Sequence, residues 1–347
     1  MQKTDFLEMW EIGEKISAAD QSLIAGKTIE EIAKNLNIST EDMESHIDFI
    51  KIGKFVKEVS EQQKYYRLST DDQELFLKYL MSKSIYDGIM PITFFRYRPV
   101  NRFLFDSLES GTFWFSEFDN LNDPLEGTDV RNYEILSDTD KIEHLRFLER
   151  KYGYLPPGTS YSMSFEKYKI MLKSVTKKVR DQIMILSLTG TPDNPDMWSN
   201  YSGSGTGICI EIDPFEDVKF FWTIHKVSYV NKLPSIIDSP KTMRLNLSGE
   251  YFQALACTKT LEWSYENEWR IVKLFNDEKV NAQPFKKSMI KSIIFGFNTS
   301  SEDKEKIKNI VSNANGYRNV IFRRIFNNEM KIVDDLDGED FVVMAKD

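Results

Sequence analysis

The stretch ILSLTGTPDNPDMWSNYSGSGTGICIEID, residues 185–213, decides the fold class of the chain. It opens on an apolar, strand-like run, passes through a loop and a short helix, and ends on a second apolar run, GICIEI. The glycine-rich turn at 203–207 has the spacing of a phosphate loop, but no helix beginning with Lys-Ser or Lys-Thr follows it. We therefore predict a tight turn into a strand, in a fold where helices and strands alternate irregularly.

Short, apolar, strand-like runs also lie on both sides of this stretch. They are ITFFRYR and TFWFSEF before it, and VSYV, WRIVKLF, SIIFGF and NVIFRRIF after it. An insert at 131–181 holds two predicted helices, 140–151 and 164–180, which Pro156-Pro157-Gly158 separates. The final part predicts a strand, a helix over SSEDKEKIKNIVSNA and a hairpin turning at Asn327-Asn328. Residues 92–347 thus predict an α+β domain with a mixed, mainly antiparallel sheet and a helical insert.

Residues 1–69 predict a winged helix-turn-helix module. Thr28, with a glutamate three residues later, can form a capping box for the helix TIEEIAKNL, whose apolar residues recur at helical spacing. Ser39 can cap a second helix, which we expect to end near Gly53. The run FVKEVSEQQKYYRLS, 55–69, predicts the two strands of a wing.

Charge bears on what this module binds. The second helix carries four acids against one lysine: Glu41, Asp42, Glu44, Asp48 and Lys51. Such a helix would repel phosphates where it must enter a DNA groove. The wing is more basic, so nucleic-acid contact through the wing and docking of a protein both stay open. Residues 70–91 are predicted to be a linker helix.

Composition narrows the class of protein. At 347 residues, two domains are expected, and a net charge of −9 with a pI near 5.2 argues against broad phosphate binding. Cys209 and Cys257 stand in apolar contexts typical of buried thiols, and the three histidines lack zinc spacing. Because the start of the chain lacks the order of a signal peptide and apolar runs fall short of roughly 18 residues, we expect a cytoplasmic protein without a membrane partner.

Two segments carry residues suited to anion or cation binding. In FFRYR, Arg96 and Arg98 flank Tyr97 on a strand, where two guanidinium groups can clamp a phosphate or a carboxylate. In FSEFDNLNDPLEG, three polar residues share a turn: Asn122, Asp123 and Glu126. They could hold a cation or a ribose hydroxyl, and an Asx turn explains the first two equally well.

Two further segments suggest a catalytic site. The loop and short helix after the strand with Ser187 and Thr189 carry Met197, Trp198 and Tyr201. In KTLEWSYENEWRIVKLF, Glu266 and Glu268 lie two apart before a strand, so in extended backbone they would face the same side and raise each other's pKa. Glu262 and Arg270 could pair with these acids.

Together the four segments, in this order, resemble the family known as domain of unknown function 2971. The residues that carry the resemblance are FFRYR, Asn122-Asp123-Pro124-Leu125-Glu126, Met197-Trp198-Ser199-Asn200-Tyr201 with Gly207, and Lys259 followed by Trp263-Ser264-Tyr265-Glu266-Asn267-Glu268-Trp269-Arg270. The resemblance covers residues from about 92 to the end and implies no activity.

The order of residues is also similar to the ADP-ribosyltransferase superfamily, and this resemblance does imply an activity. It implies that Arg96 or Arg98 would grip the diphosphate of NAD. Ser187 and Thr189 would shape the nicotinamide pocket, with Trp198 or Tyr201 as an aromatic lid. Glu268 would bind a ribose hydroxyl and stabilise an oxocarbenium-like transition state, while Glu266 would orient the acceptor.

Three classes of function remain open on the sequence. The first is an NAD-dependent ADP-ribosyltransferase or other NAD-consuming effector acting on an unknown acceptor, such as a toxin or phage-defence component. The second is a non-catalytic regulatory protein that binds nucleic acid or a partner protein. The third is a metal-dependent nuclease that gathers Asp123, Glu126, Glu266 and Glu268 around Mg²⁺.

Overall fold

A computed structural model describes most of the chain, namely residues 6–11, 28–62, 64–127, 137–155, 157–231, 233, 255–275, 280–326 and 330–335. The chain divides into two compact units. The first comprises 1–93 and 213–222, and the second comprises 94–212 and 223–347. A short segment after the middle of the chain thus belongs to the N-terminal unit.

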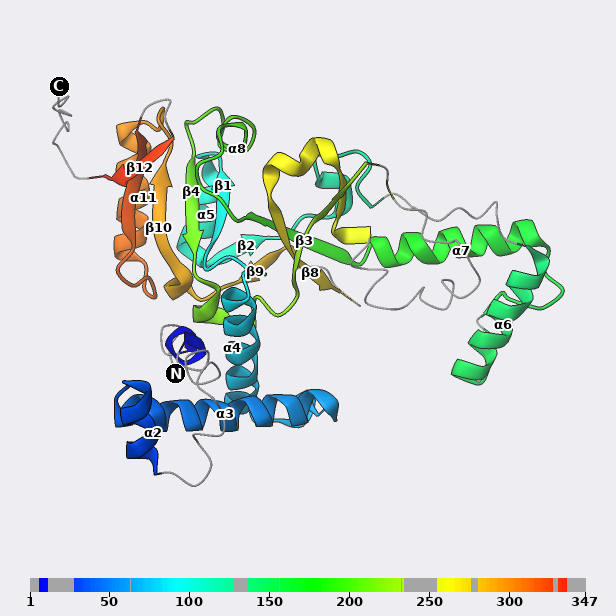
Figure 1. The fold of residues 1–347 in the computed structure, drawn as a ribbon. Coiled ribbons are helices and arrows are strands. Elements are labelled where there is room, and N and C mark those ends of the chain that lie inside the picture. Colours follow the sequence, from blue (N-terminus) through cyan, green and yellow to red (C-terminus); the bar gives the residue numbers. More distant parts are fainter. Residues whose placement is uncertain are drawn as a thin grey trace. The chain divides into compact units, whose positions relative to one another are not determined.

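The first unit is built from helices. Those described are 6–11, α2 (Ile29–Leu36), α3 (Thr40–Glu61) and α4 (Thr70–Tyr86), of which the last three are labelled in Figure 1. The predicted capping box begins α2, because Thr28 Oγ1 accepts from the N–H of Glu31 and the Glu31 carboxylate accepts from the N–H of Thr28. Ser39 and Asp42 form a second box at the start of α3. The left-handed Asn37 between the two helices makes the turn sharp.

The prediction of a wing is wrong for the described residues. Helix α3 does not end near Gly53 but runs on to Glu61, and a 3₁₀ turn follows at Tyr65–Arg67. Val56 and Val59 are both buried, so the apolar residues of this run follow a helical period rather than the alternation of a strand. Gly53 lies inside this helix, where its lack of a side chain leaves room for the hydroxyl of Tyr79; an added Cβ would lie 2.7 Å from that oxygen. Contact of this unit with nucleic acid or protein stays a prediction.

Aromatic rings form the core of the first unit. Phe6 packs edge-on against Phe49, with ring centroids 6.0 Å apart, and Trp10 lies 4.7 Å from the same ring. Tyr79 of α4 lies 5.2 Å from Phe49. Phe215 packs 5.7 Å from Phe6, which ties the segment 213–222 to this unit.

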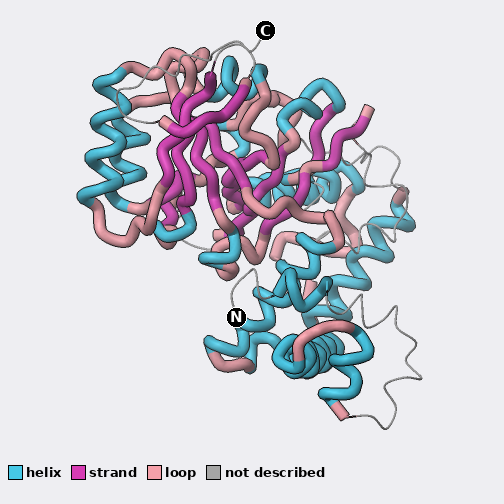
Figure 2. Tube along the Cα trace, turned by 60° about the vertical axis from the view of Figure 1, so that its left-hand side comes forward, coloured by secondary structure: helices cyan, strands magenta, loops and turns pink. Residues whose placement is uncertain are grey.

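The second unit is organised around an eight-stranded sheet (Figure 2). Its strand order is β12-β11-β10-β4-β1-β3-β8-β5. The strands are β1 (Phe94–Arg98), β3 (Ile183–Thr189), β4 (Ile208–Ile212), β5 (Ile224–Lys226), β8 (Glu268–Leu274), β10 (Ile290–Phe295), β11 (Ile321–Phe326) and β12 (Lys331–Asp334). Among the described strands of this sheet, only β10 and β11 pair in parallel, joined through helix α11 (Ser301–Asn313), and the other neighbours are antiparallel. The predicted α+β class with a mainly antiparallel sheet is confirmed.

The remaining elements surround this sheet or extend from it. They are the strand pairs β2 (Thr112–Trp114) with β9 (Ala282–Pro284) and β6 (Ser228–Val230) with β7 (Thr258–Thr260), and the helices α5 (Arg102–Ser110), α6 (Asp138–Tyr152), α7 (Phe165–Arg180) and α8 (Pro195–Tyr201). The two predicted insert helices are α6 and α7, which pack together through Leu145, Tyr168 and Leu172. The predicted hairpin is β11–β12, whose turn lies outside the described residues.

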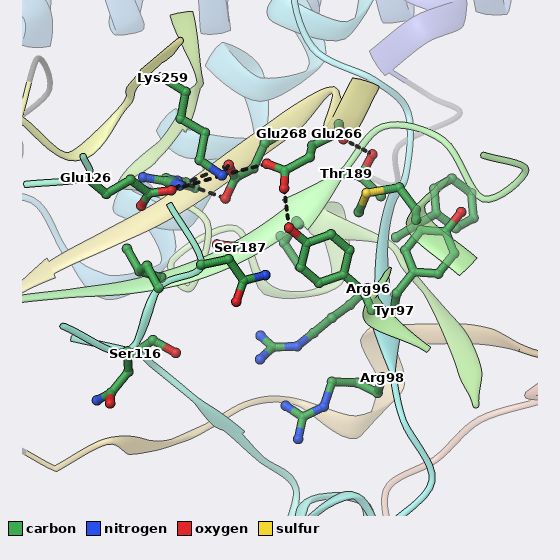
Figure 3. Close-up of a pocket in the computed structure, with 18 of the residues that line it drawn as sticks. Arg96, Tyr97, Arg98, Ser116, Glu126, Ser187, Thr189, Lys259, Glu266 and Glu268 are labelled. Atoms are coloured by element: carbon green, nitrogen blue, oxygen red, sulfur yellow. Dashed lines mark hydrogen bonds and ion pairs between the residues drawn. The ribbon is translucent and has the colours of Figure 1, made fainter. Parts of the chain in front are cut away.

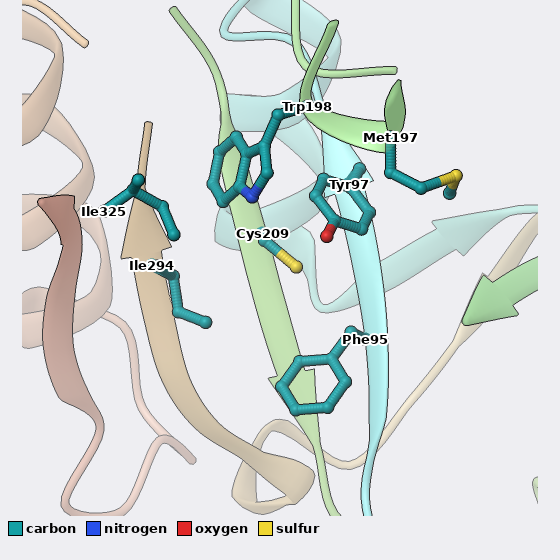
Figure 4. Packing of buried hydrophobic residues seen from close by; sticks show 7 residues of the cluster. All are labelled: Phe95, Tyr97, Met197, Trp198, Cys209, Ile294 and Ile325. Carbon is teal, nitrogen blue, oxygen red and sulfur yellow. The ribbon is translucent and has the colours of Figure 1, made fainter. Parts of the chain in front are cut away.

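One face of the central strands carries a core cluster, shown in Figure 4. Its buried members are Phe95, Tyr97, Met197, Trp198, Cys209, Ile294 and Ile325. Cys209 and Cys257 are both buried and free, as predicted. The glycine turn leads into β4 as expected. Gly207 is required there, since an added Cβ would lie 2.2 Å from the carbonyl oxygen of Arg98.

In the described part of the chain, every helix is too short or too polar to span a bilayer.

Candidate functional site

The site lies where the central sheet comes apart. Strands β1 and β3 are paired at a single position, Phe95 with Thr189. Further along the same edge of β3, Ile185 exchanges two backbone hydrogen bonds of 2.8 Å with Ser116. Because backbone groups alternate along a strand, the N–H and C=O of Ser187 point to this same edge, between the two pairings. A gap thus opens between β1 and the middle of β3.

A cavity of about 250 Å³ occupies this gap. Its lining comes from β1, β3 and β8, from helix α8, from strand β7 and the 3₁₀ helix after it, and from the segment around 116–126: Phe95, Arg96, Tyr97, Arg98, Pro99, Ser116, Asn120, Leu121, Asn122, Glu126, Ser187, Leu188, Thr189, Met197, Tyr201, Lys259, Glu266, Glu268 and Arg270. Figure 3 shows a cluster of charged side chains around Lys259 on one side and two arginines on the other. These two sides differ in how their charges are balanced.

On one side, Lys259 is surrounded by three carboxylates. Its Nζ lies 2.9 Å from Glu126 Oε1, 2.6 Å from Glu266 Oε2 and 2.9 Å from Glu268 Oε2. Arg270 continues the cluster, since its Nε lies 2.8 Å from Glu268 Oε1 and its Nη2 lies 2.9 Å from Glu126 Oε1. All five side chains are buried. Three carboxylates against two cations leave one uncompensated negative charge.

The pKa values in this charge cluster, which consists of Glu126, Lys259, Glu266, Glu268 and Arg270, follow from these contacts. Burial by itself would raise the pKa of Glu268, but the charges of Arg270 and Lys259, with hydrogen bonds from Arg270 and Ser187, lower it to about 2. Burial and the negative charge of Glu268 raise the pKa of Glu266. The carboxylates in turn raise the pKa of Lys259 and that of Arg270, although burial opposes both. Lys259 and Arg270 are therefore fixed cations.

The turn at 122–126 delivers Glu126 to this cluster. Asp123 Oδ1 accepts from the N–H of Leu125 at 2.8 Å, which is an Asx turn, and the N–H of Glu126 donates to the carbonyl of Asp123 at 3.1 Å. Asp123 is buried but does not line the cavity. The role of Asp123 in the structure is thus to shape the turn that directs Glu126 toward the cavity.

Glu266 and Glu268 reach Lys259 by a route that the sequence did not predict. They are not both in extended backbone: Glu266 ends a 3₁₀ helix, Leu261–Glu266, and Glu268 begins β8. Asn267 between them is left-handed, with φ of 42°. This local bend brings both carboxylates to one ammonium group, and the expectation of a shared strand face is wrong.

On the other side, Arg96 and Arg98 form no ion pair within the described part of the chain. Arg96 Nη2 donates to the carbonyl of Trp114 at 3.2 Å, while Nη1 is buried and has no hydrogen-bond partner there. Its guanidinium lies 5.3 Å from the ring centre of Phe113. Burial, together with the charge of Arg98, lowers the pKa of Arg96 well below its usual range, and burial lowers that of Arg98. Figure 3 shows both guanidinium groups pointing the same way.

Tyr201 and Thr189 both donate hydrogen bonds to Glu266. The Tyr201 hydroxyl donates to Glu266 Oε1, and the side chain of Asn122 also bonds to Tyr201. Thr189 Oγ1 donates to the backbone carbonyl of Glu266 at 2.7 Å. Both oxygens of the Glu266 carboxylate are therefore occupied by protein groups.

Two aromatic residues near the site belong mainly to the core, and one of them, Trp198, does not lie where the resemblance implied. Trp198 is fully buried in the core cluster of Figure 4, and its Nε1 donates to the carbonyl of Pro192 at 2.9 Å, so the prediction of Trp198 as a lid is wrong. Tyr97 touches the cavity but packs its ring 5.1 Å from that of Trp198 and donates to the carbonyl of Thr191. Burial raises the pKa of Tyr97, in keeping with a core position.

The sequence missed Lys259 and Ser116 as site residues. Lys259 follows the apolar run ALACT, which was a signal for a buried and therefore paired cation. Ser116 had no such signal, because it enters the site only through its bridge to Ile185.

The carboxylates that a metal ion would need are already in contact with protein cations. Lys259 and Arg270 lie between Glu126, Glu266 and Glu268 at contact distance. Among the described residues, no group of three histidines, cysteines or acids is arranged to hold a metal ion. The geometry thus disfavours gathering these acids around Mg²⁺.

Comparison with known protein families finds a match over part of this site. Residues 197–271 match the model of a family described as "Protein of unknown function (DUF2971)". The match includes Tyr201, Lys259, Glu266, Glu268 and Arg270, and does not extend to Arg96, Arg98, Glu126 or Ser187. No curated protein and no solved structure matches the chain.

Proposed function

We propose that this cavity binds NAD and transfers its ADP-ribosyl group to an acceptor or to water. One observation carries the proposal: three adjacent strands, β1, β3 and β8, bring Arg96 and Arg98, Ser187 and Glu268 to one cavity. These are the residues to which the resemblance to ADP-ribosyltransferases assigns diphosphate binding, shaping of the nicotinamide pocket and stabilisation of the transition state.

The distribution of charge supports NAD as the ligand. NAD carries a positively charged nicotinamide ring next to a ribose and a negatively charged diphosphate. The cavity offers the complement, with an uncompensated negative charge around Glu268 and two cations, Arg96 and Arg98, that form no ion pair with any described residue. A guanidinium is suited to this task because its planar donors match phosphate oxygens.

The size of the cavity limits how much of the ligand it encloses. A volume of about 250 Å³ lies just below the range of about 300–1,000 Å³ usual for small-molecule sites. We expect it to enclose the nicotinamide, its ribose and the diphosphate, while the adenosine extends outside. The N–H and C=O of Ser187, which point to the edge of β3 that faces the gap, suit the carboxamide of the nicotinamide, which has a matching acceptor and donor.

The chemistry requires little of the protein beyond position and charge. The bond between the ribose C1′ and the nicotinamide nitrogen breaks, and its electron pair leaves with nicotinamide, which becomes neutral. The ribose develops positive charge at C1′, and the negative charge around Glu268 stabilises it. The acceptor forms the new bond to C1′ and releases its proton.

Release of nicotinamide tests this proposal. The full chain is incubated with NAD, and free nicotinamide is measured over time for the wild type, Glu268→Gln and Ser187→Ala. We expect release by the wild type, a loss of about a hundredfold or more in Glu268→Gln, and a smaller loss in Ser187→Ala. Thermal unfolding of each variant checks that it is folded.

Glu262→Gln is the matched control, because Glu262 is an exposed acid four residues before Glu266 and should leave the rate unchanged. A wild-type protein that releases no nicotinamide, with or without cell extract as a source of acceptor, contradicts the proposal. Full activity of folded Glu268→Gln contradicts it as well.

A role as a toxin or phage-defence effector is part of the same proposal. Induced expression in a bacterial host should slow growth and deplete NAD or modify a cellular acceptor, and Ser187→Ala should relieve this effect. Equal growth inhibition by wild type and Ser187→Ala would separate the effect from the cavity.

A further inference from the structure

The three buried glutamates differ in how many of their oxygens the protein itself occupies. Glu268 accepts from Arg270 at both oxygens, and Lys259 lies 2.9 Å from its Oε2. Glu266 accepts from Tyr201 at Oε1 and from Lys259 at Oε2. Each oxygen of these two carboxylates therefore has at least one side-chain donor.

Glu126 is the exception. Its Oε1 is shared by Lys259 and Arg270, each 2.9 Å away, whereas its Oε2 is buried and has no hydrogen-bond partner among the described residues. The side chain is 2% exposed and lines the cavity. A buried acceptor without a partner costs about 1–3 kcal/mol, so a ligand that supplies a donor recovers this cost.

We propose that Glu126 is the carboxylate that accepts a hydrogen bond from a ribose hydroxyl of the ligand. The inference deepens the proposed function, since it gives this role to Glu126 rather than to Glu268. Arg96 and Arg98 set the position of the phosphate groups, and the sugar attached to them then extends toward the charge cluster (Figure 3). Sugar hydroxyls are the donors that lie nearest a phosphate in such a ligand.

Two features allow Glu126 to meet the ligand. Glu126 lines the cavity, and the last torsion of a glutamate is broad and soft, so its carboxylate can adjust to a donor that the ligand presents. The Asx turn made by Asp123 fixes the backbone from which this side chain extends. Glu126 is therefore placed by a rigid turn and keeps one free acceptor.

The experiment compares ADP-ribose with ADP, which lacks the terminal ribose. Affinities of both ligands are measured by titration calorimetry on the full-length wild type, on Glu126→Gln and on Glu262→Gln. In Glu126→Gln the amide oxygen can stay with Lys259 and Arg270, which places an NH₂ group, a donor, where the wild type presents an acceptor. The substitution also leaves two carboxylates against two cations, so the cluster remains balanced.

We expect the wild type to prefer ADP-ribose to ADP by about tenfold or more, because hydrogen bonds to a charged group are among the stronger ones. Glu126→Gln should lose this preference while its affinity for ADP stays unchanged. Glu262→Gln should keep the preference. If Glu126→Gln does not fold, Asp123→Ala, which loosens the turn and keeps the charge, should lose part of the same preference.

An unchanged preference in Glu126→Gln overturns the inference. So does an equal loss of affinity for both ligands, which indicates a structural role, and so does a wild type that binds neither ligand or does not distinguish them. The nicotinamide assay separates the two proposals. If the ribose preference depends on Glu126 but no nicotinamide is released, the ligand site stands and the transfer reaction does not.

Discussion

The two sides of the cavity differ in whether the protein itself balances their charges, and in burial, since the side chains around Lys259 are buried while Arg96 and Arg98 are half-buried. Around Lys259 and Arg270, every cation contacts two or three carboxylates. Arg96 and Arg98, across the same cavity, have no ion-pair partner in the described part of the chain. A buried pair that is broken costs several kcal/mol, whereas an unpaired buried charge costs stability until a ligand neutralises it. We therefore expect the charge cluster to contribute most to stability, and we propose that the arginine pair binds the negatively charged part of a ligand.

Arg270→Met should give the largest effect. It leaves Glu126 and Glu268 buried with one cation fewer, so we expect the free energy of unfolding to fall by about 3–5 kcal/mol. Urea denaturation of the full chain measures it. A loss below about 1 kcal/mol would mean that the charge cluster contributes little to the stability of the folded protein.

Lowering the pH should weaken the same charge cluster, because protonation of Glu268 removes the negative charge of its ion pairs. Its pKa in the folded protein is lowered from 4.5 to about 2, so its contribution to stability is present above 4.5 and is lost as the pH falls toward 2. Glu266, whose pKa is raised, does not make the unfolding free energy depend on pH in this range. Below pH 4.5 its carboxyl group is protonated in both the folded and the unfolded chain. We expect the unfolding free energy of the wild type to drop more steeply than that of Glu268→Gln between these pH values. If the unfolding free energies of the two proteins fell in parallel with pH, the ion pairs of Glu268 would not stabilise the fold as proposed.

Gly207→Ala should disturb the arginine side through the backbone. Its new Cβ would lie 2.2 Å from the carbonyl oxygen of Arg98 and 2.6 Å from that of Ser202. We expect a loss of about 1–3 kcal/mol in unfolding free energy and weaker ADP binding, because β1 must shift at Arg98. Gly153→Ala is the control for losing a glycine, since an added Cβ there meets nothing within 4 Å, although its positive φ carries some strain. Unchanged ADP binding in Gly207→Ala would show that the position of Arg98 does not matter.

Tyr201→Phe should have the smallest effect. It removes only the hydroxyl that bonds to Glu266, so we expect a loss of about 1 kcal/mol in thermal or urea unfolding. Tyr154→Phe, at an exposed position, should change nothing. A loss of several kcal/mol in Tyr201→Phe would place this residue among the main supports of the cluster.

Local sequence patterns predicted the elements well and their contacts less well. Caps at Thr28 and Ser39 and the apolar runs of the sheet were readable because each depends on neighbouring residues only. The wing failed because Val56 and Val59 follow a helical period and Gly53 serves to admit Tyr79, which depends on a distant helix.

The same contrast between local patterns and long-range contacts applies to the site. Residue types pointed to Arg96, Arg98, Glu126, Ser187, Glu266 and Glu268, and all of these line one cavity. Lys259 as the centre of the carboxylates could not be derived, because it requires the bend at Asn267 and the turn at Asp123 to act together. Nor could the break between β1 and β3, since an apolar run does not reveal where its pairing stops.

The most direct test measures stability and ligand affinity on one variant, Arg96→Met with Arg98→Met. Methionine keeps the apolar packing against Phe113 and removes both cations. We predict that the affinity for ADP-ribose falls by about tenfold to a hundredfold, while the unfolding free energy stays equal or rises. A loss of several kcal/mol in stability with unchanged affinity would contradict the assignment of these arginines to a ligand.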